Sequence, residues 1–222
     1  MRISLTSGAP AELALPPGSP ARGLVLVPDV MGLRPLFDDL CARLAREHAW
    51  AVCAPEPFPG HEDFTLDQRF GYMPQVSDDQ RLGDIVAAAD RLAAEVALDR
   101  IGILGFCMGG MYTLKAAGLG RFDRAVAFYG MLTVPKEWRA EGTGEPLDWL
   151  ARPSPTKVLA VIGGRDALVP PEDVAKLRAL GDRAEIAFYP EGEHGFVHDP
   201  ARPSHRAADA ADAWARAIAF LA

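Results

Sequence analysis

The sequence contains few cysteines and no long apolar run. Its three cysteines, Cys41, Cys53 and Cys107, fit neither a CxxC pair nor the spacing of Cys/His zinc ligands. No stretch approaches the roughly 18 apolar residues that a membrane helix needs. The first ten residues, MRISLTSGAP, also lack the apolar core of a secretory signal. These absences argue against a disulfide scaffold and predict reduced thiols, a cytoplasmic location and no membrane partner.

An excess of positive charge is missing as well. The chain carries 23 Lys and Arg against 30 Asp and Glu, a net charge of -7, and the charges are scattered rather than blocked. A nucleic-acid partner is therefore not expected. The length of 222 residues and the hydrophobic content of 49% predict one domain, residues 1–222, with a substantial core. No long exposed apolar seam is evident, so a monomer is expected.

Short apolar runs alternate with segments of helical periodicity. Leu36, Leu40 and Leu44 share one helix face, and Ser77 with Gln80 has the spacing of a capping box at the start of a helix over 77–97. A third helix is predicted over 206–222. The predicted strands are 2–6, 12–16, 23–28, 50–56, 100–106, 124–130, 157–164 and 184–191. This alternation predicts an α/β fold with a mostly parallel central sheet and helices on both faces.

Two segments depart from the alternation. Residues 55–76 and 131–155 are long, rich in proline and aromatic residues, and each follows a predicted strand. Long excursions in a compact domain are commonly functional loops or lids. Because ligands of α/β sheets bind at the carboxyl ends of the strands, both segments are expected near a binding site.

The strongest motif is Gly105-Phe106-Cys107-Met108-Gly109, in which a cysteine takes the nucleophile position of a G-x-nucleophile-x-G turn. A buried strand precedes it and a helical segment follows, which is the context that such a turn requires. The free N–H groups at the start of the helix would favour a thiolate. The alternative is a structural cysteine in a tight packing turn, since cysteine is among the most buried residue types.

Two further residues make the structural alternative less attractive. Asp166 follows the strand 157–164, and His194 follows the strand 184–191, in the order nucleophile, acid, histidine. Taken singly, an Asp there is usually a turn residue and a His beside glycines a loop residue. Together they predict a triad in which Cys107 forms an acyl-thioester, His194 transfers protons and Asp166 orients the imidazole.

A tetrahedral oxyanion requires two N–H donors. The backbone of Met108, directly after the nucleophile, is expected to supply one of them. The other should come from the loop after the strand 23–28, for which Val30 is the candidate.

These residues resemble the dienelactone hydrolase family. The segments GFCMGG, GGRDALVP, EHGF and PDVMGL carry the resemblance, which extends over about residues 23–221. It implies an α/β-hydrolase fold and an enzyme that opens small-molecule lactones or cleaves small-molecule esters. The resemblance implies neither a cofactor nor a metal. The cysteine is its most specific part, because most α/β-hydrolases use serine at that position.

The resemblance also implies further site residues. Asp29 matches a family carboxylate that contacts the thiol, although it is one methylene shorter than the family's glutamate and has a plain turn carboxylate as its alternative reading. Arg69, with Arg81 as second choice, matches an arginine that binds the substrate carboxylate. The family's other arginine is replaced by His198, and Arg202 and Arg206 are out of register. Tyr129 and Phe196 follow strand ends and are expected to line the substrate pocket.

Three other functions stay open from the sequence. The chain could hydrolyse a different, neutral ester or a thioester, which the missing arginine favours. It could be a scaffold without catalysis, against which the three intact triad residues argue. It could also be a redox sensor, for which Cys53 is a poor resolving thiol because it lies in a predicted buried strand.

Overall fold

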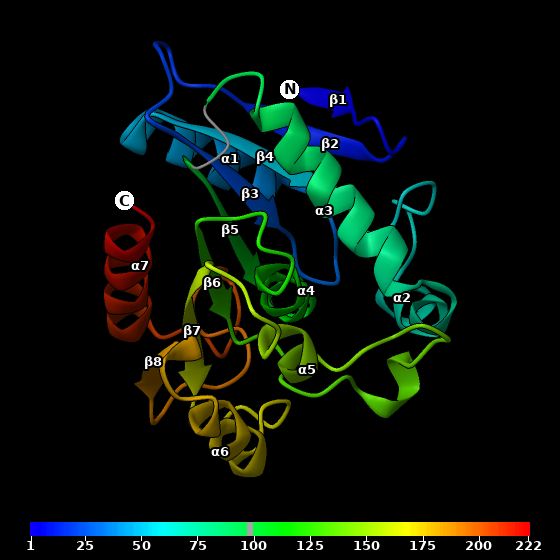
Figure 1. Cartoon of the computed structure of the whole chain (residues 1–222), viewed down its shortest axis with the longest axis vertical. Helices are drawn as coiled ribbons and strands as arrows, with labels where there is room; N and C mark the ends of the chain where they lie inside the picture. Colours follow the sequence, from blue (N-terminus) through cyan, green and yellow to red (C-terminus); the bar gives the residue numbers. More distant parts are fainter. Residues whose placement is uncertain (97–99) are drawn as a thin grey trace.

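A computed structural model describes residues 1–96 and 100–222, and its centre is a single eight-stranded sheet (Figure 1). The strands are β1 (Arg2–Ser4), β2 (Pro10–Ala14), β3 (Arg22–Val27), β4 (Trp50–Pro55), β5 (Ile101–Phe106), β6 (Arg124–Phe128), β7 (Lys157–Gly163) and β8 (Glu185–Tyr189). Their order is β1-β2-β4-β3-β5-β6-β7-β8; the pairs β1–β2 and β2–β4 are antiparallel, and the other five pairs are parallel. The predicted mostly parallel sheet is confirmed.

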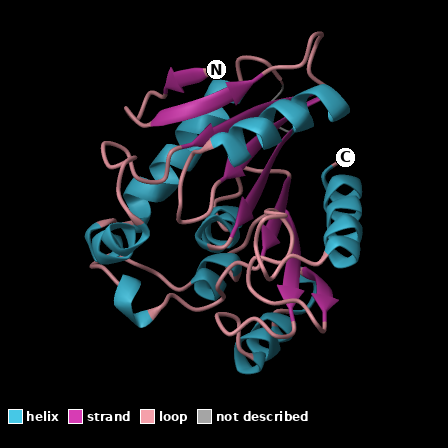
Figure 2. Cartoon of the chain, turned by 180° about the vertical axis from the view of Figure 1, so that it is seen from behind, coloured by secondary structure: helices cyan, strands magenta, loops and turns pink. Residues whose placement is uncertain are grey.

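Helices cover both faces of this sheet. The strands β3, β4 and β5 are buried at every residue, which explains why they read as continuous apolar runs. Helices α1 (Pro35–His48) and α7 (Ala207–Leu221) lie on one face, and α3 (Asp78–Leu92) and α4 (Met108–Ala117) on the other (Figures 1 and 2). Right-handed crossovers require this division, because the chain steps to one side of β3 through α1 and to the other through α3 and α4.

The helix predicted over 77–97 is shorter than expected. It begins after Ser77, whose hydroxyl accepts a hydrogen bond from the N–H of Gln80 at 3.3 Å, and it ends at Leu92. Residues 93–96 form turns, and the last residue of the predicted helix, Ala97, lies outside the described residues. The alanines after Leu92 continued the apolar sequence pattern beyond the residue at which the helix ends.

The two predicted loops contain short helices. Residues 55–76 include α2 (Leu66–Tyr72) and a 3-10 turn, η1 (Met73–Gln75), and residues 131–155 include η3 (Lys136–Trp138) and α5 (Pro146–Leu150). Thr65 and Gln68 form a reciprocal capping box that starts α2. The two segments meet where the ring of Phe70 stacks on that of Trp138, with centroids 5.7 Å apart.

A helix outside these two segments was also not predicted. Helix α6 (Pro171–Ala179), followed by η4 (Gly181–Arg183), connects β7 to β8. Only Val174 and Leu177 among its apolar residues are buried, so its sequence lacks a clear apolar stripe. Within the described ranges, no helix is both long and apolar enough to cross a membrane.

Candidate active site

Cys107 occupies a strained turn between β5 and α4. Its backbone has φ 56° and ψ -119°, in the left-handed half of conformational space that side chains other than glycine rarely adopt. Its N–H donates to the carbonyl of Phe128 at 3.0 Å, and its carbonyl accepts from the N–H of Met111 at 3.0 Å. Both hydrogen bonds fix the turn, so the sulfur is held at the N-terminus of α4, where negative charge is favoured.

The glycines beside this turn allow the strand and the helix to approach closely. A Cβ atom on Gly105 would lie 2.3 Å from the carbonyl oxygen of Gly109. One on Gly109 would lie 2.3 Å from the carbonyl oxygens of both Val27 and Pro28. Only glycine fits at either position, and the start of α4 is thereby packed against the end of β3.

Asp166 and His194 lie together because β7 and β8 are neighbouring parallel strands. Gly163 pairs with Tyr189 at the carboxyl ends of these strands, and each candidate follows its strand within a few residues. The Nδ1 atom of His194 is 2.8 Å from Oδ2 of Asp166. The other carboxylate oxygen of Asp166 accepts from the N–H of Leu168 at 2.9 Å, so the carboxylate is fixed in orientation.

The second nitrogen of His194, Nε2, is buried and has no hydrogen-bond partner within residues 1–96 and 100–222. Burial by itself lowers the pKa of His194. The hydrogen bond of Asp166, the nearby thiol of Cys107 and the charges of both residues outweigh burial and raise this pKa to about 10. An imidazole in this setting is therefore protonated near neutral pH.

The two candidate oxyanion donors start neighbouring segments. Met108 is the first residue of α4, and Val30 lies in the turn after β3, against which α4 packs. In the part of the chain that the structure describes, neither N–H donates to another protein atom. Their role as oxyanion donors stays a prediction.

The carboxylate of Asp29 is buried and engaged by other side chains. Arg34 binds it through two nitrogens, at 2.7 Å and 2.9 Å, and the Nε2 atom of His198 lies 2.9 Å from Oδ2. Oδ1 also accepts from the N–H of Met31 at 2.9 Å. None of the hydrogen bonds of Asp29 among the described residues goes to the thiol of Cys107, so the predicted contact between them stays a prediction.

These partners set the protonation states of the group. Burial by itself would raise the pKa of Asp29, but the hydrogen bonds of His198 and Arg34 and the charge of Arg34 hold it well below its usual range. Burial lowers the pKa of His198 despite the neighbouring Asp29. A neutral His198 beside an ionised Asp29 must carry its proton on Nε2, which leaves Nδ1 as a hydrogen-bond acceptor.

Tyr129 connects this group to the candidate triad. Its hydroxyl contacts Nδ1 of His198, and its ring lies edge-on to that of His194 with centroids 5.3 Å apart. It is fully buried, and its backbone φ of 38° is again in the left-handed region. Burial, together with the charges of Cys107 and Asp29, raises the pKa of Tyr129 well above its usual value, so the hydroxyl stays protonated.

The other two substrate-binding candidates are buried in internal contacts. Arg69 donates to the carbonyls of Phe64 and Glu62, at 3.0 Å and 2.6 Å, and lies 3.6 Å from the carboxylate of Glu56. Phe196 packs on Tyr129 and Tyr189, with centroids 5.8 Å and 5.2 Å away. Neither contact set tests a role in substrate binding, and both roles stay predictions.

Arg34 is the residue that the sequence reading missed. It stands five residues after Asp29, at the entrance to α1, and the guanidinium also lies over the ring of Phe37 at 4.8 Å. A basic residue shortly after a buried-strand carboxylate was the only available signal. Within the described ranges, no group of three or more His, Cys, Asp or Glu side chains is arranged to hold a metal ion.

The chain is similar to known hydrolases over nearly its whole length. The model of the dienelactone hydrolase family matches residues 10–222. A relative from Escherichia coli (strain K12) named "Putative carboxymethylenebutenolidase" is 35% identical, over 96% of this chain and 81% of the relative. The carboxymethylenebutenolidase of Rhodococcus opacus is 29% identical, over 89% of this chain and 79% of the relative.

Solved structures give the same result. The crystal structure of a "Putative Dienelactone Hydrolase" from Klebsiella pneumoniae superposes with a TM-score of 0.88 at 30% identity, covering 100% of this chain and 97% of that one. An α/β-hydrolase from Penicillium at 14% identity still has a TM-score of 0.74, over 100% of this chain and 96% of that one, which shows the shared fold. The sequence match over residues 10–222 and the shared α/β-hydrolase architecture place the chain in the dienelactone hydrolase family, as a carboxylic ester hydrolase of the lactone- and ester-cleaving kind.

Proposed function

We propose that the chain hydrolyses its lactone or ester by covalent catalysis, with Cys107 as nucleophile, His194 as proton-transfer group and Asp166 as the residue that orients His194. The observation that carries this proposal is the 2.8 Å contact between Nδ1 of His194 and Asp166. With that nitrogen occupied, Nε2 is the one left to serve the thiol held at the start of α4.

In the first half of the reaction, the thiolate of Cys107 attacks the carbonyl carbon and forms a carbon–sulfur bond. The carbonyl electron pair moves to oxygen, and the N–H groups of Met108 and Val30 stabilise the oxyanion. When the pair returns, the ester carbon–oxygen bond breaks and the leaving oxygen takes the proton from Nε2 of His194. In a lactone, this leaving oxygen remains attached to the acyl chain.

In the second half, water attacks the thioester carbon and gives a proton to the now neutral Nε2 of His194. The carbon–sulfur bond breaks and the sulfur leaves as a thiolate beside the imidazolium. The product is a free carboxylic acid, and no cofactor or metal enters any step. Asp166 remains ionised and stabilises the imidazolium formed in this step.

Two kinds of substrate are candidates, one that carries a carboxylate and one that is uncharged. A dienelactone carries a carboxylate, for which family resemblance nominates Arg69. The guanidinium of Arg69 already donates to two carbonyls and faces Glu56, and His198 is neutral and engaged with Tyr129 and Asp29. These contacts favour a second candidate, an esterase or thioesterase that acts on an uncharged substrate. A carboxylate contact between Asp29 and the thiol would require the side chain to leave Arg34 or His198.

One experiment tests both levels of this proposal. Hydrolysis of dienelactone and of a neutral aryl ester is measured with wild type, Cys107→Ala and the matched thiol variant Cys41→Ala. We expect Cys107→Ala to abolish both reactions and Cys41→Ala to retain them, because Cys41 is buried in α1. Turnover that survives in Cys107→Ala would overturn the mechanism, whereas hydrolysis of only the neutral ester would decide for the second candidate.

Three predictions about the whole chain stay predictions. These are that residues 1–222 act as one domain, that the protein is a monomer, and that it works in the cytoplasm without a nucleic-acid or membrane partner. Size-exclusion chromatography with light scattering tests the monomer directly.

A further inference from the structure

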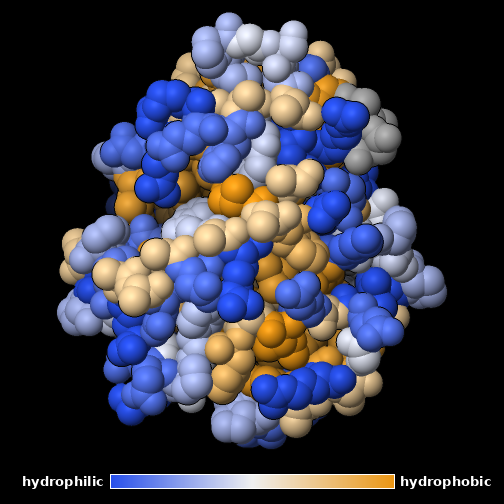
Figure 3. Space-filling view, turned by 90° about the vertical axis from the view of Figure 1, so that its left-hand side faces the viewer, coloured by the Kyte–Doolittle hydropathy of each residue, from blue (hydrophilic) through white to orange (hydrophobic). Residues whose placement is uncertain are grey.

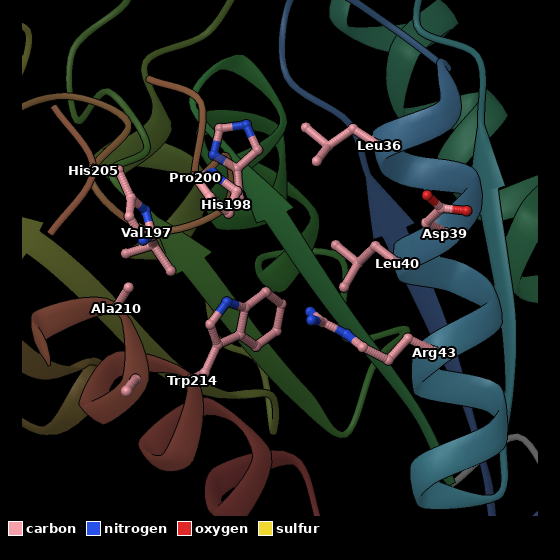
Figure 4. Close-up of a pocket in the computed structure, with 11 residues that line it drawn as sticks. Leu36, Asp39, Leu40, Arg43, Val197, His198, Pro200, His205, Ala210 and Trp214 are labelled. Atoms are coloured by element: carbon pink, nitrogen blue, oxygen red, sulfur yellow. The ribbon is translucent and has the colours of Figure 1, made fainter. Parts of the chain in front are cut away.

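A groove runs between α1 and α7, on the face of the sheet opposite α4 (Figure 4). Its volume is about 350 Å³, within the range of pockets that hold small organic molecules. Leu36 and Leu40 point into it from α1, and Trp214 faces them from α7. Cys107, Asp166 and His194 are not among its lining residues, so the groove is separate from the candidate triad. Figure 3 shows the α7 side of the molecule, where apolar side chains gather among charged ones.

The groove combines an aromatic wall with a free positive charge. The guanidinium of Arg43 lies over the indole of Trp214, 5.7 Å from its centroid. Arg43 forms no ion pair within residues 1–96 and 100–222, although Asp39 stands one helical turn away. A guanidinium held over an aromatic ring keeps its N–H groups available for a carboxylate. The Nδ1 atom of His205, on the opposite wall, is buried and has no protein partner among the described residues.

His198 joins the groove to the candidate active site. It lines the groove, while its two ring nitrogens contact Tyr129 and Asp29. Its ring also stacks on Phe106, with centroids 4.8 Å apart, and Phe106 directly precedes Cys107. Trp214 packs on the same ring of Phe106, at 5.8 Å. A molecule in the groove therefore touches residues that contact the nucleophile's own strand.

We propose that the α1–α7 groove is a second binding site, for a small planar monocarboxylic acid, and that its occupant changes the turnover of the active site through His198 and Phe106. The planar body would lie against Trp214 and the leucines of α1. The carboxylate would pair with Arg43. The acidic side chain of Asp39 disfavours a second negative charge on the ligand. Only the effect on turnover rests on the proposed function, whereas the binding itself does not.

Binding is tested on Cys107→Ala, which has no nucleophile, with benzoate as the probe. We expect saturable binding by calorimetry, with a dissociation constant on the order of 1 mM, as befits so small a ligand. We also expect a change in tryptophan fluorescence that is lost in Trp214→Phe. Arg43→Gln should weaken binding about tenfold or more, because a charged hydrogen bond is lost. Benzamide, which has the same shape without the charge, should bind Cys107→Ala at least as weakly as benzoate binds the protein with Arg43→Gln.

The matched control is Arg46→Gln. Arg46 is exposed on the same helix, forms its one ion pair among the described residues with Glu47 at 3.3 Å, and does not line the groove. It should leave benzoate affinity unchanged. Equal affinities of benzoate for Arg43→Gln and Arg46→Gln, or a fluorescence change that persists in Trp214→Phe, would overturn the site.

The effect on turnover is measured with wild type and a neutral aryl ester. Saturating benzoate should change kcat at least about twofold, and Arg43→Gln should keep the basal kcat but lose the effect. A rise in KM alone, with kcat constant, would place benzoate in the catalytic cleft and overturn the coupling. If the wild type hydrolysed no ester at all, the proposed function would fail, while the binding data on Cys107→Ala would still decide the site.

Discussion

The Nε2 atom of His198 lies 2.9 Å from Oδ2 of Asp29, and both side chains are buried. Arg34 binds the same carboxylate, and Tyr129 contacts the opposite nitrogen of the imidazole. A continuous polar connection therefore runs from the turn after β3 to the tyrosine beside His194. Asp29 is ionised, His198 is neutral and Tyr129 is protonated, so the donors and acceptors between these three side chains are defined.

We predict that Asp29→Asn destabilises the fold by about 3 kcal/mol, because it leaves Arg34 and His198 without their buried anion. Urea denaturation at pH 7 measures the loss. The pKa of Asp29 is lowered in the folded state. Its contribution is therefore present above the unfolded pKa, about 3.9, and is lost as pH falls through the lower folded value. The difference between wild type and variant should shrink in strong acid, and a difference that grew there would contradict the assignment.

The order of the candidate triad residues along the chain could be predicted from the sequence, but the hydrogen-bond partners of Asp29 could not. Continuous apolar runs such as the one before Cys107 occur where strands are buried on both faces, and the ends of such strands place Asp166 and His194 at one edge of the sheet. These features depend on local pattern and on the parallel order of the strands, which is why the fold and the Asp166–His194 contact were accessible.

The partners of Asp29 depend on contacts that sequence spacing does not encode. His198 is 169 residues away along the chain, and its position suggested a substrate contact rather than a buried partner of Asp29. Helix α6 escaped detection for a different reason, since few of its residues face the core. Burial of polar groups and of sparse apolar faces is decided by tertiary packing, which a one-dimensional pattern does not contain.

We predict that the activity of the enzyme has an alkaline limb at high pH, set by His194. The pKa of His194 is raised to about 10, so the imidazolium that protonates the leaving group persists to that pH. Asp166→Asn should move the alkaline limb of kcat/KM down by about 1 to 3 pH units, because the charge that supports the imidazolium is lost. The pH profile of an aryl ester reaction measures both values.

The same ionisation affects stability. Because the folded pKa of His194 lies above the unfolded value of about 6.5, its contribution is complete below that value and is lost as pH rises through about 10. For activity, an alkaline limb of kcat/KM that stayed at the same pH in Asp166→Asn would show that a group other than His194 controls this limb.

We predict opposite effects for two glycine-to-alanine substitutions in helices. In Gly109→Ala, the added carbon would lie 2.3 Å from backbone oxygens at the end of β3, so α4 and Cys107 must shift. We expect a loss of about 1 to 3 kcal/mol and a large fall in kcat. In the control Gly83→Ala, nothing lies within 4 Å of the added carbon, and stability should rise by about 0.5 to 1 kcal/mol with unchanged activity. Equal effects of the two substitutions, measured by urea denaturation and ester turnover, would refute the packing argument.

We predict that the ion pair between Lys115 and Asp78 secures the segment 131–155. Its Nζ–Oδ1 distance is 2.6 Å, neither side chain is exposed, and the second carboxylate oxygen accepts from the N–H of Gly144 at 2.8 Å. Burial lowers the pKa of Lys115, and the hydrogen bond and charge of Asp78 oppose this shift. Lys115→Met leaves the buried carboxylate of Asp78 without its ion-pair partner and should lower the free energy of unfolding by about 3 to 5 kcal/mol.

The double variant Asp78→Asn with Lys115→Met is the informative comparison. The amide oxygen of the new side chain in Asp78→Asn can still accept from the N–H of Gly144, and no charge is left unpaired. The double variant should therefore be more stable than Lys115→Met alone. Urea denaturation of the two single variants and the double variant completes the cycle. A double variant as unstable as the sum of the single variants would show that the two side chains act independently, and that the segment 131–155 is held by other contacts, such as that between Phe70 and Trp138.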